Sequence, residues 1–189
     1  SKRRLEAEAI RDAILSISGE LDLKPPVGSE VAKLGEGVAR GGLQLQGAID
    51  GRVKYRSIYL PVARDFHLDS LSLFDFADPA VVSGERATTS VPSQSLYLMN
   101  NPFVLRQADR AARRLRLAHD GDRERIEAAY LLFLSRPPSP AERDLSERFL
   151  REYPENLARE GVPPEQRRST TLAAFCQALF GSAEFLYRN

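Results

Sequence analysis

Three side chains in the stretch from Asp65 to Asp69 have the types and spacing of metal ligands. Asp65, His67 and Asp69 alternate with two apolar residues. Alternate residues of an extended strand share one face, so two carboxylates and an imidazole would meet there and could bind one metal ion. An ordinary exposed strand produces the same alternation. We therefore favour a surface strand over a metal site.

A denser group of polar residues lies between residues 64 and 100. Irregular backbone of this kind must satisfy its own hydrogen bonds, which makes a structural network the default interpretation. Binding sites are also commonly built on loops held by helices, so this is where we expect any ligand to bind. The members of this polar cluster are Arg64, Asp75, Asp78, Arg86, Thr88, Thr89, Gln94 and Asn100.

Glu6 is out of place in the first predicted helix, residues 2–18. At about 100° per residue it falls at the centre of an apolar stripe. A buried carboxylate needs a partner, and Arg3, one turn earlier, is the nearest candidate. We favour an ion pair that anchors the helix over a carboxylate with a raised pKa that lines a pocket. The stripe consists of Ala9, Ile10, Ala13, Ile14 and Ile17, with Arg4, Glu8, Arg11 and Asp12 on the opposite side.

The remaining reactive residue types have structural explanations. Cys176 lies in an apolar helical stretch, where a small buried side chain is expected, and one thiol makes neither a disulfide nor a cysteine-based zinc site. His119 stands where a helix should end, and a cation there favours the helix dipole. The glycine-rich run at residues 35–42 lacks the Lys-Ser/Thr ending of a phosphate-binding loop.

Arginines recur along the predicted helix that starts at Pro102. Arg106, Arg110, Arg113 and Arg114 fall within an arc of about 100°. This spacing would suit an anionic ligand, but aromatic residues for base stacking are not interleaved with it. We favour a solvated face, or pairing with acidic neighbours, over phosphate binding.

The overall charge excludes the usual electrostatic argument for nucleic acid or an anionic membrane. Lys and Arg number 27 against 26 for Asp and Glu. The sequence has no apolar stretch of the length that a membrane span requires, so we expect no membrane insertion by this segment. The chain begins at Ser1 without an initiator Met, which we interpret as a fragment of a larger protein.

The elements that must position these residues are mainly helical. We predict one domain over residues 1–189, a helical bundle-like fold with a long glycine-rich loop and one or two short extended segments. Residues 1–100 contain the first helix and an irregular or extended part, with a flexible loop at 24–51 and a strand-like stretch at 54–62. A short helical turn is predicted at 68–76 and a short helix from Ser93.

Residues 101–189 are predicted to be helical throughout. Asn101 caps a helix that runs to about Ala118, and Asp122 caps the next. Ser139-Pro140-Ala141-Glu142 is a capping box and starts a helix that runs to about Tyr153. A last long helix spans about 164–180, and Ser182 caps a final turn.

Several ordered motifs resemble a large planctomycete family, domain-of-unknown-function family 1553. They span nearly the whole chain: RRLEAEAIRD at 3–12, YRSIYLPV at 55–62, LFDFADP at 73–79, RATTSVPSQSLYLMNNPFV at 86–104, LSRPP at 134–138 with Glu142, and EFLY at 184–187.

The resemblance implies the C-terminal part of a much larger extracytoplasmic protein, periplasmic or at the cell surface. Members of the family carry a signal sequence, a cytochrome-c-like domain and a companion domain upstream. This chain has no Cys-x-x-Cys-His for haem attachment, so we expect no cofactor in it and assign any haem c to the upstream part. The expected partners are the upstream domains of the same polypeptide. The ligand, if there is one, is not identified by the residues.

Two hypotheses follow. The first is a non-catalytic scaffold or interaction domain of a cytochrome-linked protein, in which the polar residues pair off in buried ion pairs with no cavity. The alternative is part of a composite active site for periplasmic redox or polysaccharide-related chemistry, completed by upstream domains. The alternative predicts that five residues meet on one open cleft: Arg3, Glu6, Arg64, Asp75 and Arg86.

Overall fold

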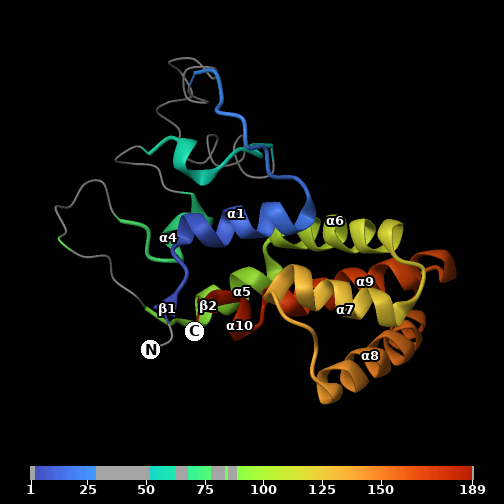
Figure 1. Ribbon diagram of the computed structural model, residues 1–189. Helices are drawn as coiled ribbons and strands as arrows, with labels where there is room; N and C mark the ends of the chain where they lie inside the picture. Colours follow the sequence, from blue (N-terminus) through green and yellow to red (C-terminus); the bar gives the residue numbers. More distant parts are fainter. Residues whose placement is uncertain (1–2, 29–51, 63–67, 78–83, 85–88, 189) are drawn as a thin grey trace.

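The computed structural model describes residues 3–28, 52–62, 68–77, 84 and 89–188, and it is mainly helical, as predicted (Figure 1). The predicted glycine-rich loop therefore lies largely outside the described residues. Four long helices form the C-terminal half: α6 (Pro102–Ala118), α7 (Asp122–Leu134), α8 (Pro140–Arg159) and α9 (Pro164–Phe180).

The helix α6 is the centre of the hydrophobic core. Its inward positions Val104, Ala108, Ala111 and Leu115 are at most 3% exposed, which confirms the predicted face. The small alanines let α9 lie close along α6, while α8 packs on α7 and α9. The same core continues into α1 (Ala7–Ser18), which packs on α6.

The predicted helix ends are mostly confirmed. Asn101 accepts a hydrogen bond from the Phe103 N–H at 2.8 Å, and both halves of the capping box between Ser139 and Glu142 form. Gly19 ends α1 in the left-handed conformation, with φ of 79°. Gly121, rather than Asp122, is the residue that precedes α7.

The helix α8 is longer than predicted, because it continues through Pro154 to Arg159. A proline inside a helix removes one backbone hydrogen bond and usually ends or kinks the helix. Leu157 lies beyond the proline and is only 4% exposed. Packing of this side chain therefore outweighs the local preference for an end near Tyr153.

The remaining elements are short. They are β1 (Arg3–Arg4), the 3-10 helix η1 (Ser57–Tyr59), α4 (Asp69–Ser72), α5 (Pro92–Asn100), α10 (Ala183–Leu186) and β2 (Tyr187–Arg188). Among them, α4 and η1 pack on α1. Two of them, α4 and α5, match the helical segments predicted at 68–76 and from Ser93. The stretch at 54–62, predicted to be strand-like or extended, is non-helical up to Arg56 and forms no regular strand. Only Tyr55 makes a bridge, to Asp22, and the chain then turns into η1, where the Ser57 N–H and hydroxyl both donate to Asp12.

The two ends of the described chain lie together. The strands β1 and β2 pair antiparallel, with Arg3 opposite Arg188 and Arg4 opposite Tyr187. The Leu5 N–H extends this pairing to the Leu186 carbonyl at 2.8 Å. Figure 1 shows both ends at the foot of the α1 and α5 region, away from the α7–α8 hairpin.

Arg11 was predicted to lie on the solvent side of α1, and this is wrong, because it is 3% exposed. Its guanidinium donates to the carbonyls of Val53 at 2.7 Å and Tyr55 at 3.2 Å, and to the Ser57 hydroxyl at 3.1 Å. The segment that precedes η1 therefore covers the side of α1 that the helical periodicity assigned to solvent.

We expect Arg11→Met to lower the free energy of unfolding by about 2–4 kcal/mol, since it fills the space but leaves two buried carbonyls without their donor. Urea unfolding of the chain measures this loss. The control is Arg148→Met on the exposed part of α8, which should change stability by no more than about 0.5 kcal/mol. Equal effects of the two substitutions would contradict the role of Arg11.

Candidate functional site

Asp75 is the centre of the part of the polar cluster that the structure describes. Its carboxylate accepts from the Arg4 guanidinium at 2.5 Å, from the Thr89 N–H at 2.7 Å and from the Thr89 hydroxyl at 2.8 Å. Arg4 also donates to the Phe74 carbonyl at 3.1 Å and to the Thr89 carbonyl. The Arg4 side chain is 3% exposed and the Asp75 side chain 15%. This is a buried ion pair that joins β1 to two irregular segments.

The backbone at Asp75 supports this geometry. Asp75 has a φ of 59°, in the left-handed region that aspartate tolerates better than most residues. Burial raises the pKa of Asp75, but the hydrogen bonds from Thr89 and Arg4 outweigh it and hold the pKa below its ordinary value. The carboxylate therefore stays ionised and accepts these hydrogen bonds near neutral pH.

Gln94 belongs to the same network, and Asn100 does not. The buried Gln94 amide donates to the Leu73 carbonyl at 2.9 Å and to the Thr89 carbonyl at 3.2 Å. The exposed Asn100 side chain donates within its own helix, to the Leu96 carbonyl at 3.1 Å. Four further members of the predicted cluster, Arg64, Asp78, Arg86 and Thr88, lie outside the described residues, as do Asp65 and His67.

Glu6 does not lie in the apolar stripe, so the prediction of a buried carboxylate is wrong. The helix begins at Ala7 and Glu6 has extended backbone, so the helical periodicity does not apply to it. Its side chain is 53% exposed and pairs with Arg3 at 3.3 Å, as the structural interpretation predicted. An exposed pair of this kind stabilises the fold by at most about 1 kcal/mol.

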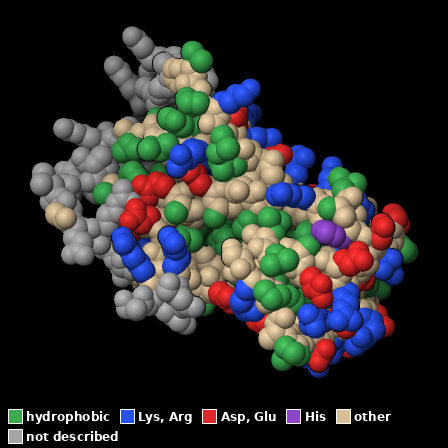
Figure 2. Space-filling model, viewed as in Figure 1, with side chains coloured by type: hydrophobic (Ala, Val, Ile, Leu, Met, Phe, Trp, Pro, Cys, Tyr) green, Lys and Arg blue, Asp and Glu red, His purple; other side chains and the backbone are tan. Residues whose placement is uncertain are grey.

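Arg3 and Glu6 line a groove of about 450 Å³ beside the paired chain ends. The strand pairing places Arg188 opposite Arg3, and a second charged pair of the lining joins Arg56 Nε and Asp12 Oδ2 at 3.7 Å. Figure 2 shows basic and acidic side chains gathered together at this end of the molecule. The complete lining is Arg3, Arg4, Leu5, Glu6, Glu8, Ala9, Asp12, Arg56, Ile58 and Arg188.

The structure therefore divides the predicted site residues between two places. Alternate residues of a strand face opposite ways. In β1 the side chain of Arg3 is exposed at the groove, whereas that of Arg4, which also borders the groove, is buried against Asp75. Asp75 is not among the residues that line the groove. The role of these residues in ligand binding stays a prediction.

A third charged cluster was not predicted. Arg136 donates two hydrogen bonds to Glu142, at 2.8 and 2.7 Å, and two to Glu184, both at 2.6 Å, and its guanidinium lies 5.6 Å from the Tyr130 ring centre. Hydrogen bonds from Arg136 outweigh burial and lower the pKa of Glu142 to about 2. This cluster fastens α10 to the start of α8. The sequence signal was the arginine of the 134–138 motif, which stands beside two prolines. Glu184, the second carboxylate that Arg136 binds, is 48 residues away in the sequence, so the motif alone did not indicate the cluster.

The described residues offer little for covalent or metal chemistry. Burial raises the pKa of the Cys176 thiol, with a smaller contribution from Asp109, so the thiol stays protonated in the core, as predicted. Within the described ranges, no three His, Cys, Asp or Glu side chains are grouped so that they could hold a metal ion. What the groove offers is guanidinium and carboxylate groups that can bind a charged ligand or partner.

A comparison with protein families identifies the relatives of this chain. The family model described as PSD1, protein of unknown function (DUF1553), matches residues 1–150. The chain belongs to this family. This confirms the resemblance that the sequence motifs indicated. Neither the curated proteins nor the solved structures contain a match.

The charged clusters of this domain coincide with the sequence motifs that indicated the family. The 3–12 motif contributes Arg4 and Arg11, and the 73–79 motif contributes Asp75. The 134–138 motif contributes Arg136. In the part of the chain that the structure describes, none of the helices is both long and apolar enough to cross a bilayer.

We expect Asp75→Asn to lower the free energy of unfolding by about 1–3 kcal/mol near neutral pH, because Arg4 loses a charged partner. Since the folded-state pKa of Asp75 is lowered, its contribution is present above its ordinary pKa of 3.8 and is lost as pH falls through the lowered value. The difference between native chain and variant should therefore shrink on acidification.

Urea unfolding at a series of pH values from neutral downwards measures this difference. The matched control is Asp144→Asn, at an exposed position of α8. If Asp75→Asn and Asp144→Asn have the same stability at neutral pH, the structural role of Asp75 is wrong.

Proposed function

We propose that this chain is a helical scaffold and interaction domain, the C-terminal part of an extracytoplasmic, cytochrome-linked planctomycete protein. The observation that carries the scaffold role is the network of Asp75. Its carboxylate accepts hydrogen bonds from the Arg4 guanidinium and the Thr89 hydroxyl. The Gln94 amide in turn donates a hydrogen bond to the Thr89 carbonyl. Residues held in this way fix irregular backbone and have few groups left for a substrate.

The interaction role concerns the groove beside the chain ends. Any polypeptide that precedes β1 emerges next to Arg3, which lines the groove. A tethered neighbour has a high effective concentration, so weak contacts are sufficient to hold it there. We propose that the upstream domains implied by the family resemblance dock at this groove. The proposal includes no nucleic acid, because 27 basic residues against 26 acidic ones give no general attraction for it.

Cysteine labelling tests the docking. Ile58 lines the groove and is 70% exposed, and Leu145 on α8 is 56% exposed and serves as the matched control. Ile58→Cys should react with a maleimide at least several-fold more slowly in the intact parent protein than in the 189-residue chain. Leu145→Cys should react equally fast in both, and the native Cys176 is buried in this chain. Equal labelling of residue 58 in the two proteins would rule out docking at the groove.

The alternative function is part of a composite active site for periplasmic redox or polysaccharide-related chemistry. It is favoured by one observation, the opening of the Arg3–Glu6 pair onto the groove. Because this pair is exposed, Glu6→Gln should leave folding almost unchanged. A thermal-shift screen of the intact parent against acidic sugars and small redox compounds distinguishes the two. Loss of a ligand shift in Glu6→Gln supports the composite site, whereas identical shifts support the scaffold.

A further inference from the structure

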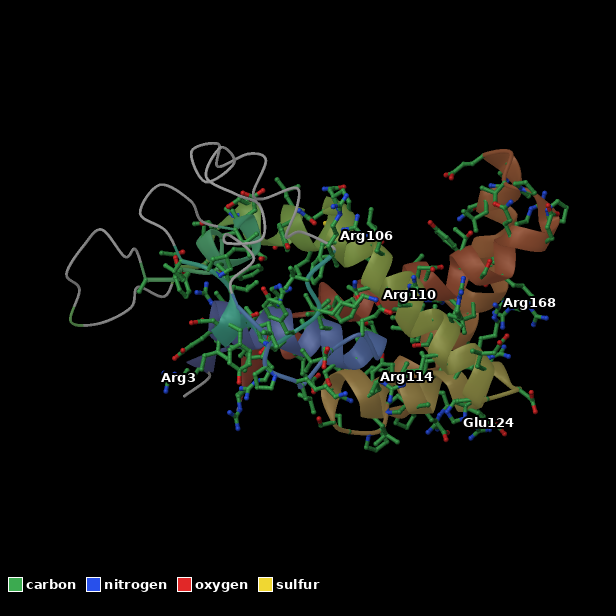
Figure 3. The ribbon with its side chains drawn as sticks, turned by 90° about the horizontal axis from the view of Figure 1, so that it is seen from above. Arg3, Arg106, Arg110, Arg114, Glu124 and Arg168 are labelled. Atoms are coloured by element: carbon green, nitrogen blue, oxygen red, sulfur yellow. The ribbon has the colours of Figure 1, made fainter. Side chains whose placement is uncertain are left out.

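The exposed face of α6 carries a concentrated positive charge that the groove and the Asp75 network do not use. The helix contains five arginines and one aspartate, although the whole chain is almost neutral. Arg106, Arg110 and Arg113, named here the α6 arginine row, are exposed and lie within about 60° of arc at helical spacing. Figure 3 shows Arg106, Arg110 and Arg114 along one side of α6, far from Arg3.

The three arginines of the row have no hydrogen-bond or ion-pair partner among the described residues, unlike Arg114. Arg114, on the same helix, donates to the carbonyls of Ser16 and Ile17 and so caps the end of α1. By contrast, Arg106, Arg110 and Arg113 take part in no hydrogen bond or ion pair with any described residue. With respect to the described residues, their guanidiniums can still bind carboxylates in the two-bonded geometry that arginine favours.

Apolar surface adjoins the row. Leu117, one further position along the same stripe, is 79% exposed, and Leu105 is 42% exposed. Arg113 also borders a mixed hollow of about 140 Å³ between α6 and α9, in which Ala112 and Leu172 are buried and the other lining residues are Asp109, Arg116 and Ser169. A second hollow, of about 260 Å³, shares Leu172 with the first. Charged and apolar contacts side by side are typical of protein interfaces.

We propose that the α6 arginine row is a docking surface for an acidic helical segment of a partner protein. Along the axis of α6, Arg110 and Arg113 lie about 6 and 10 Å from Arg106. Carboxylates that recur every three or four residues on the partner helix would have a similar spacing and could pair with these guanidiniums. Leucines of the segment would cover the exposed Leu117. Nucleic acid fits less well, because no aromatic residue stands among these arginines for base stacking. This surface is independent of the groove and of what docks there.

The test uses a fluorescent peptide of about 20 residues, with Glu at every third or fourth position and Leu on the adjoining face, and a scrambled peptide of the same composition. Fluorescence anisotropy with the 189-residue chain measures Kd at about 50 and 200 mM salt. The patterned peptide should bind more tightly than the scrambled one and more weakly at the higher salt. The combined variant Arg106→Glu/Arg110→Glu/Arg113→Glu should weaken binding about tenfold or more.

The control variant is Arg148→Glu/Arg151→Glu/Arg159→Glu, which makes the same change of charge at exposed positions of α8 and should keep the native Kd within about twofold. If both variants weaken peptide binding equally, the effect comes from the net charge of the chain and not from the α6 arginine row, and the proposal is overturned. So would absence of binding, or tighter binding of heparin or duplex DNA through the same arginines. If the α6 variant does not melt like the native chain, Arg106→Gln/Arg110→Gln/Arg113→Gln replaces it and should weaken binding to a smaller extent.

Discussion

Two buried guanidiniums hold the irregular half of this domain in place. Chain without regular structure leaves backbone carbonyls that must find donors before they can be buried. Arg4 and Arg11 supply them, and each reaches two carbonyls from segments that lie far away in the sequence. A guanidinium suits this task because its five N–H groups point outward in one plane. Burying the charge is costly, and the carboxylates of Asp75 and Asp12 offset the cost.

This constraint decides what the polar cluster can do. Asp75 lies among charged groups, as a catalytic carboxylate often does, yet its oxygens already accept from Arg4 and Thr89. A substrate would have to displace those hydrogen bonds and release two chain segments together. The groove differs, because Arg3 and Glu6 meet there in an exposed pair that can rearrange at little cost. The Arg3–Glu6 pair can therefore be changed without removing a partner of Asp75, although Arg4 both borders the groove and pairs with Asp75.

The sequence was sufficient wherever the determining interaction is local. The inward face of α6, the caps at Asn101 and Ser139 and the end of α1 at Gly19 follow from periodicity and from contacts within a few residues. The exposure of Glu6 and the burial of Arg11 did not follow. Glu6 precedes the helix whose periodicity was applied to it, and Arg11 is covered by a segment more than forty residues away. The motif identified Arg136, but its second partner, Glu184, lies far away in the sequence and is brought to it only by the fold.

Arginine therefore has two roles in this chain, and neighbouring structure distinguishes them. Arg4, Arg11, Arg114 and Arg136 each face carbonyls or carboxylates of other segments and complete the fold. The α6 arginine row presents the same chemical group without such acceptors among the described residues. Placing three like charges along one helix face opposes folding slightly, since the charges repel. Because the described residues offer this row no acceptors, the search for its carboxylates is directed to another molecule.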